Sequence, residues 1–190
     1  VKTRLGWDYD SIKIVEVAER LQDVGIKAIS IHGRTRAQMY KGDADWKPIS
    51  AVKNNSRMHI PVFGNGDVNS PERAVEMRDR YGLDGAMIGR ASIGNPWFFN
   101  QVKHYFKTRA HLEKPSIQDR VALAKRHLEM SIGWKGDVLG VLETRRHYTN
   151  YFKGIKNFKL YRTAMVTAND AQEVFNTFDR VLEEVIDPAW

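Results

Sequence analysis

The sequence has no cysteine among its 190 residues. Disulfides, thiolate metal ligands and a cysteine nucleophile are therefore excluded, and we predict no metal site. No apolar run approaches the roughly 18 residues of a membrane-spanning helix, and the first residues lack the apolar core of a signal peptide. The sequence also lacks an initiator methionine and opens in strand-like residues, so we expect a chain that starts within a fold. These features suit a cytoplasmic protein without a membrane partner.

Basic residues outnumber acidic ones. There are 30 lysines and arginines against 23 aspartates and glutamates, a net charge of +7 and a pI near 9.6. Such an excess favours a polyanionic partner, and nucleic acid is the leading candidate. The apolar fraction of 42% still allows a sizeable core.

The first half of the chain alternates strand-like and helix-like segments four times. We predict strands over 1–5, 28–31, 60–63 and 85–88. We predict a first helix with apolar residues at 14, 17, 18 and 21 and a C-terminal cap at Gly25, then helices over about 47–53, 71–81 and 96–106. Asn95 is the expected cap of the last helix, with Pro96 at its first position. This α/β rhythm is typical of a parallel sheet with right-handed crossovers. Four such units make either half of an eight-stranded TIM barrel or a small doubly wound sheet.

A polar linker at 108–115 ends this rhythm, and only helical patterns follow. Ser116 is the expected cap of the first of them, and Asn169 or Asp170 that of the last. On the last helix we expect apolar residues to be buried at positions 174, 175, 178, 181, 182 and 185. We therefore predict two domains, half a barrel over 1–110 and an all-α bundle over 116–190.

Positive charge is concentrated in the predicted bundle. Between Lys125 and Arg162, nine basic residues face three acidic ones, a local excess of +6. The stretch is either a surface for a phosphate backbone or the solvated face of ordinary helices. The pattern alone does not separate the two interpretations.

Polar and glycine residues follow each predicted strand, never precede it. The strand ends carry Lys2 and Arg4; His32, Arg34 and Arg36; Gly64, Asn65, Gly66 and Asp67; and Gly89 and Arg90. In parallel α/β folds this carboxyl edge is where ligands bind. The glycines after the third strand either only make a tight turn or, together with Gly89 and Arg90, hold a phosphate.

Four motifs along this half, in order and spacing, resemble the tRNA-dihydrouridine synthases, closest to the bacterial B-type branch. They are VKTRLGWD at 1–8, IHGRTR at 31–36, PVFGNGDV at 61–68 and GAMIGRASIGNPWF at 85–98. In the bundle, RHYTNYFKG at 146–154 resembles the basic helix of that family. The resemblance covers nearly the whole chain.

The resemblance implies a flavoprotein oxidoreductase that uses FMN, takes hydride from NADPH and reduces a uridine of tRNA. By that match the cofactor would be held by Lys2, His32, Asn65, Gly66, Asp67, Gly89 and Arg90. Arg34 would face the substrate uridine, and Arg145, Arg146 and Lys153 would contact tRNA. A lysine near the pyrimidine edge of the flavin would stabilise its anionic reduced form.

The chain departs from the family in one large respect: only the last four βα units of its barrel are represented. The catalytic cysteine belongs to the other half, so we expect a C-terminal fragment that does not catalyse the reaction alone. Two other functions stay open, a non-catalytic tRNA-binding module and an FMN barrel acting on free pyrimidines. We also expect the open half-barrel to self-associate, because its sheet edges are unpaired.

Overall fold

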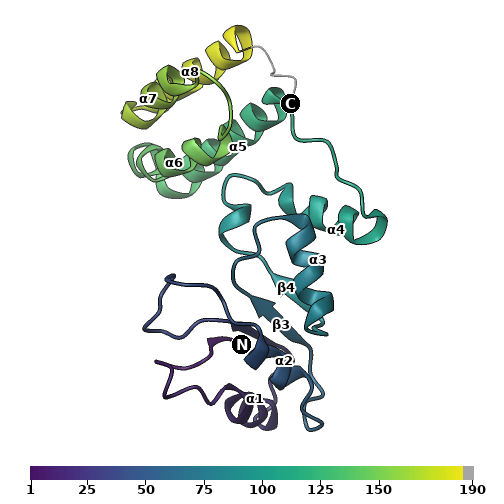
Figure 1. The fold of residues 1–190 in the computed structure, drawn as a ribbon. Coiled ribbons are helices and arrows are strands. Elements are labelled where there is room, and N and C mark those ends of the chain that lie inside the picture. The colour runs from purple at the N-terminus through teal and green to yellow at the C-terminus, as the bar shows by residue number, and fades with distance from the viewer. Residues whose placement is uncertain (186–190) are drawn as a thin grey trace. The chain divides into compact units, whose positions relative to one another are not determined.

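The computed structural model describes residues 1–185, and the protein divides into two compact units (Figure 1). One consists of residues 1–92 with 98–112, the other of residues 93–97 with the chain from 113 onward. Residues 186–190 of the predicted second domain lie outside the described residues. None of the helices described is both long and apolar enough to span a membrane.

The first unit contains a four-stranded parallel sheet in the order β1-β2-β3-β4. The strands are β1 (Lys2–Arg4), β2 (Ile29–His32), β3 (Val62–Asn65) and β4 (Gly85–Met87). The predicted α/β class is confirmed. The third strand begins and ends two residues later than predicted. Pro61 has no N–H for the ladder, so the strand starts at Val62, and Asn65 pairs with His32 instead of lying in a turn.

Helices follow the strands as expected for successive βα units. They are α1 (Ile14–Asp23), α2 (Lys47–Lys53), α3 (Pro71–Arg80) and α4 (Phe98–Thr108). The hydroxyl of Ser70 caps α3 by accepting a hydrogen bond from the N–H of Arg73 at 3.1 Å. Four βα units amount to half of an eight-stranded barrel.

The predicted start of the fourth helix is wrong. A 3₁₀ turn, η1 (Arg90–Ser92), comes first, and α4 begins only at Phe98. Gly94, with a φ of 69°, lies in the turn that separates η1 from α4. A Cβ at Gly94 would lie 2.4 Å from the Cβ of Asn150, so the segment 93–97 packs with the helical unit.

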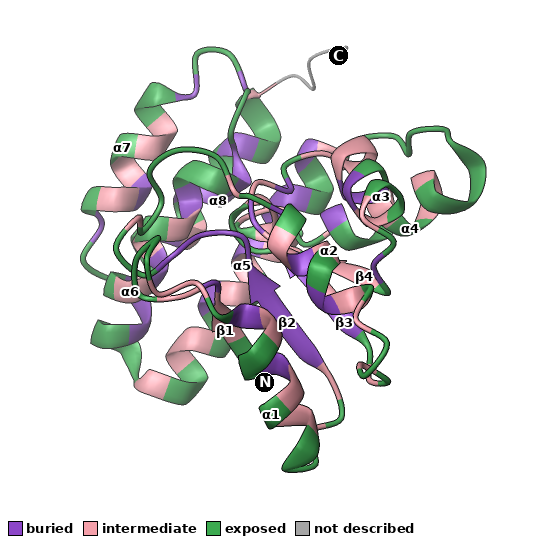
Figure 2. Ribbon diagram, turned by 60° about the horizontal axis from the view of Figure 1, so that its bottom comes forward, coloured by how far each residue is buried: buried purple, intermediate pink, exposed green. Residues whose placement is uncertain are grey.

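The two faces of the sheet differ in chemistry, because side chains alternate along each strand. Ile29, Ile31 and Val62 are fully buried against the helices, and β2 is buried along its whole length (Figure 2). By the register, the opposite face carries Lys2, Arg4, Ser30, His32, Phe63, Asn65, Gly85 and Met87. This mostly polar face corresponds to the interior of a barrel and ends at the predicted ligand edge.

The second unit is all-α apart from its loops. Its helices are α5 (Ile117–Lys135), α6 (Asp137–Tyr151), α7 (Lys159–Thr167) and α8 (Ala171–Glu184). Ser116 caps α5 in a capping box with Asp119, and Asp170 caps α8. Large aromatic side chains fill the core: Tyr148, Phe152, Phe158 and Phe178. Burial of Leu182 was wrongly predicted, since that residue is 39% exposed.

We predict that Gly64→Ala destabilises the first unit by about 1–3 kcal/mol, because the new methyl group overpacks the core. Its Cβ would lie 2.0 Å from Cζ3 of Trp46, whereas a Cβ at Gly89 would meet no atom within 4 Å. Urea unfolding should therefore place Gly89→Ala within about 0.5 kcal/mol of the wild type. Equal losses for the two variants would contradict this packing.

Candidate functional site

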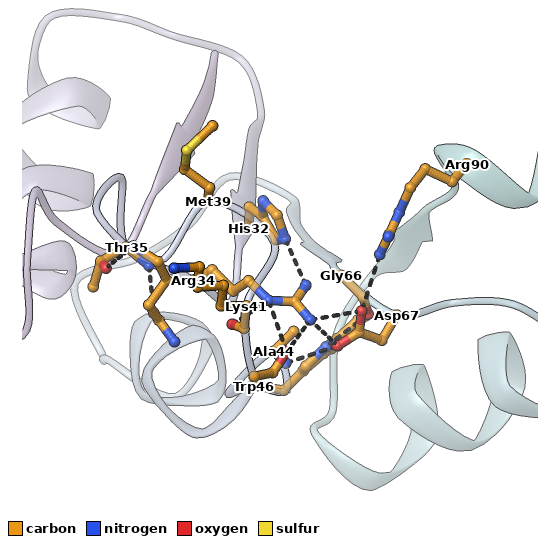
Figure 3. A network of polar contacts seen from close by, with 12 residues as sticks. His32, Arg34, Thr35, Met39, Lys41, Ala44, Trp46, Gly66, Asp67 and Arg90 are labelled. Atoms are coloured by element: carbon orange, nitrogen blue, oxygen red, sulfur yellow. Dashed lines mark hydrogen bonds and ion pairs between the residues drawn. The ribbon is translucent and has the colours of Figure 1, made fainter.

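The carboxylate of Asp67 is the centre of a polar network at the carboxyl edge of the sheet (Figure 3). Arg34 donates through Nη2 to both carboxylate oxygens, at 2.9 and 2.7 Å. The N–H of Ala44 donates at 2.8 Å, and Nη2 of Arg90 reaches Oδ1 from the other side at 3.2 Å. Burial alone would raise the pKa of Asp67, but these donors outweigh it and the pKa is lowered.

Arg34 organises the loop that follows β2. Its side chain is only 3% exposed. Besides binding Asp67, its guanidinium donates to the carbonyl oxygens of Lys41 and Gly42. Arg34 therefore positions Asp67 and the loop in this structure. Its contact with substrate stays a prediction.

His32 is neutral in this network, with its proton on Nδ1. Its Nε2 lies 3.3 Å from Nη1 of Arg34, and a guanidinium can only donate, so Nε2 accepts. Burial, followed by the charges of Arg4, Lys2 and Arg34, lowers the pKa of His32 to about 4. His32 thus presents an N–H donor and no charge at neutral pH.

Glycines after β3 allow two chain segments to approach closely. Gly66 has a φ of 122°, and a Cβ there would lie 2.5 Å from the Cβ of Ala44 and 3.0 Å from Cδ2 of His32. Its carbonyl accepts from Nε1 of the buried Trp46 at 3.2 Å. Asp67 follows with a φ of 54°, a conformation that aspartate tolerates better than most residues. The turn thus allows close packing against Ala44 and His32 and orients the Asp67 carboxylate toward Arg34.

The other predicted cofactor residues lie around this centre. The Asn65 amide donates to the carbonyl of Met87 at 2.8 Å and so links the ends of β3 and β4. Gly89 is exposed with open space beside it, and the Arg90 side chain is 63% exposed. Lys2 lies on the same sheet face as His32, and burial, then Arg4, lowers its pKa.

The three predicted tRNA contacts of the helical unit differ in availability. Arg146 and Lys153 are exposed. Arg145 is half-buried and donates to the carbonyl oxygens of Thr167 and Ala168 and to the side chain of Asn169. Arg145 therefore ties α6 to the end of α7.

Trp46 and Tyr40 belong to this site but were not singled out from the sequence. Trp46 is 1% exposed and packs under Gly64. The ring of Tyr40 lies 5.0 Å from Cζ of Arg90 and 5.9 Å from Cζ of Arg4. Both could have been identified from the sequence, because they are large aromatic residues in an otherwise polar loop.

Replacing the two arginines that bind Asp67 should have unequal effects. We predict a loss of about 3 kcal/mol for Arg34→Leu, because it breaks a buried ion pair and leaves loop carbonyls unsatisfied. Arg90→Leu should cost less than about 1 kcal/mol, because its partner contact is solvent-screened. Urea unfolding of both variants tests this, and similar losses would refute the assigned roles.

His32 should make folding stability depend on pH. Its pKa is about 4 in the folded protein against 6.5 when unperturbed. The contribution is therefore complete above pH 6.5 and is lost as pH falls toward 4, by at most about 3 kcal/mol. The difference in unfolding free energy between wild type and His32→Gln should change by this amount between pH 7 and 4.5. A difference that is constant with pH would contradict the prediction.

Comparison with known proteins agrees with this arrangement of strands and motifs. The family model "Dihydrouridine synthase (Dus)" matches residues 1–186. "Probable tRNA-dihydrouridine synthase 1" of Synechocystis sp. is 38% identical over 182 residues, which are 96% of this chain and 50% of that protein. "tRNA-dihydrouridine synthase B" of Pseudomonas putida is 37% identical over 172 residues, 90% of this chain and 50% of that protein.

A third relative, "tRNA-dihydrouridine synthase B" of Vibrio parahaemolyticus, is 39% identical over 153 residues, covering 80% of this chain and 47% of its own length. The chain thus spans about half the length of the curated relatives it matches. With the family match extending from residue 1 to 186, this chain belongs to the dihydrouridine synthase family.

Proposed function

We propose that this chain is the C-terminal part of an FMN-dependent tRNA-dihydrouridine synthase, which reduces uridine in tRNA to 5,6-dihydrouridine with NADPH. The observation that carries the proposal is the mostly polar inner sheet face, which ends at Asp67, Gly89 and Arg90. Family membership and the names of the relatives support the reaction.

The residues at the end of β4 suit the phosphate of FMN. Gly89 is open on its Cβ side, so an anion could approach the backbone there. Asp67 is already paired with Arg34, so the exposed guanidinium of Arg90 retains net positive charge for a phosphate. Gly66 is buried and makes the turn possible. Asn65 and Asp67 would lie beside the ribityl chain.

Lys2 and His32 would meet the flavin ring from the neighbouring strands. When bound, FMN supplies hydride transfer between the nicotinamide and the uracil. Lys2 would place a cation beside the ring, where negative charge develops on reduction. His32 would donate a hydrogen bond from Nδ1 without adding charge, because Arg34 holds Nε2 as an acceptor.

The helical unit would bind tRNA through its excess of basic residues. Arg146 and Lys153 are exposed and available for phosphate contacts. Arg145 would support this surface through its bonds to the end of α7. A second function, tRNA binding without reaction, is favoured for the isolated chain because it has no cysteine.

The decisive experiment supplies the missing half. We would fuse this chain to the half of the Synechocystis relative that it does not cover, and assay NADPH-dependent dihydrouridine formation in a tRNA transcript. We expect a flavin-containing chimera that releases FMN on denaturation and is active, while the 190-residue chain alone forms no dihydrouridine. A folded chimera that binds no flavin would refute the proposal.

The tRNA surface has its own test in salt dependence. Replacing two phosphate contacts in Arg146→Glu/Lys153→Glu should weaken tRNA binding and reduce the slope of log K against log salt by about 2. The matched control is Arg20→Glu/Arg80→Glu, which makes the same charge change at helix-surface residues that are 77% and 64% exposed. Equal effects of the two double variants would show that only total charge matters.

A further inference from the structure

Large side chains are unusually exposed on the loops that follow β1 and β2. Trp7 and Tyr9 are each 69% exposed, Tyr40 is 60% and Met39 is 53% exposed. Single exposed apolar residues need no explanation, but several aromatic residues at one edge of a sheet indicate a binding surface. We call Arg4, Trp7, Tyr9, Arg36, Met39 and Tyr40 the aromatic rim.

The first part of the rim is a tryptophan–arginine pair on two tied loops. The N–H of Arg36 donates to the carbonyl of Gly6 at 2.9 Å, and the N–H of Ala37 donates to that of Trp7 at 2.7 Å. These backbone bonds fix the loops against each other and leave both side chains exposed. Cζ of Arg36 lies 5.9 Å from the Trp7 ring, within cation–π distance.

The second part is a tyrosine between two arginines. Cζ of Arg90 and of Arg4 lie 5.0 and 5.9 Å from the Tyr40 ring. Arg4 also donates to the carbonyl oxygens of Thr35 and Met39, at 2.8 and 3.0 Å. These hydrogen bonds hold Met39, the residue before Tyr40, whose backbone φ is 51°. The ring is thus presented at a defined position beside the network of Asp67.

Charge on the rim favours a polyanion over an apolar protein segment. Within residues 1–185, neither Arg36 nor Arg4 forms an ion pair with a carboxylate. Their positive charges are therefore uncompensated, next to exposed aromatic rings. Interleaved guanidinium groups and rings offer phosphate contacts and stacking faces together, which is the combination that binds single-stranded nucleic acid.

We propose that the aromatic rim binds unpaired RNA nucleotides next to the uridine that enters the site, with bases stacked on Trp7 and Tyr40 and phosphates near Arg36 and Arg4. The inference rests on the proposed function in taking RNA as the substrate. It adds a second RNA contact, on the first unit, to the basic surface of the helical unit. Stacking tolerates any base, so the rim would contribute affinity and positioning with little sequence preference.

The test uses the 190-residue chain and a single-stranded uridine hexanucleotide as the probe. Trp7→Leu should weaken binding about 5- to 150-fold, the range for loss of one stacked base. Arg36→Gln should weaken it as well and lower its salt dependence. Circular dichroism checks that both variants are folded, and Arg36→Gln keeps the test valid should Trp7→Leu unfold.

Phe106→Leu is the matched control. Phe106 is 41% exposed and its ring lies 3.7 Å from Cζ of Arg78, so it offers a ring and a guanidinium on helices of the same unit, outside the rim and outside the basic stretch of the helical unit. We expect its loss to leave hexanucleotide binding unchanged. Equal weakening by Phe106→Leu and Trp7→Leu would overturn the proposal, as would wild-type binding by both rim variants.

The chimera separates this inference from the proposed function. A rim covered by the other barrel half would make Trp7→Leu destabilise the chimera without changing its tRNA affinity, and the proposal would fall. Loss of tRNA affinity at unchanged stability would support it. A chimera that forms no dihydrouridine, while Trp7→Leu still weakens hexanucleotide binding, would refute the proposed reaction but support RNA binding by the rim.

Discussion

The carboxylate of Asp67 joins three loops that come from three different strands. Arg34 and the N–H of Ala44 bind it from the loop after β2, and Arg90 binds it from the segment after β4. Asp67 itself follows the glycine turn of β3. Since Arg34 already satisfies the carboxylate from a buried position, Arg90 can exchange its contact without leaving a charge unpaired. One buried arginine therefore fixes the carboxylate, while a second, more exposed arginine shares it.

The alternation of side chains along the strands explains why the predicted cofactor residues come together. Lys2, His32 and Asn65 lie far apart in the sequence but share one sheet face, because neighbouring strands pair in register. The helices cover the opposite face with apolar residues. A sheet that helices cover on one face leaves its polar face available to a ligand.

Much of the fold could be predicted from the sequence, because it depends on local signals. Hydrophobic periodicity and caps such as Ser70 and Ser116 located most elements to within a few residues. The start of α4 could not be predicted, because the packing of Gly94 against Asn150 overrides a plausible Asn95 cap. The strand ends identified the candidate site, but not that Arg34 would be buried and structural while Arg90 stays exposed. That difference arises from burial, which depends on contacts between distant loops.

The Arg34–Asp67 pair also closes a loop of 33 residues in a chain that has no disulfides. A non-covalent clip of this kind opens only when several contacts break together, including those to Ala44, Gly42 and His32. The loops after β2 and β3 should consequently behave as one cooperative unit in hydrogen exchange, with similar protection of their amides. The site would then be assembled or lost as a whole.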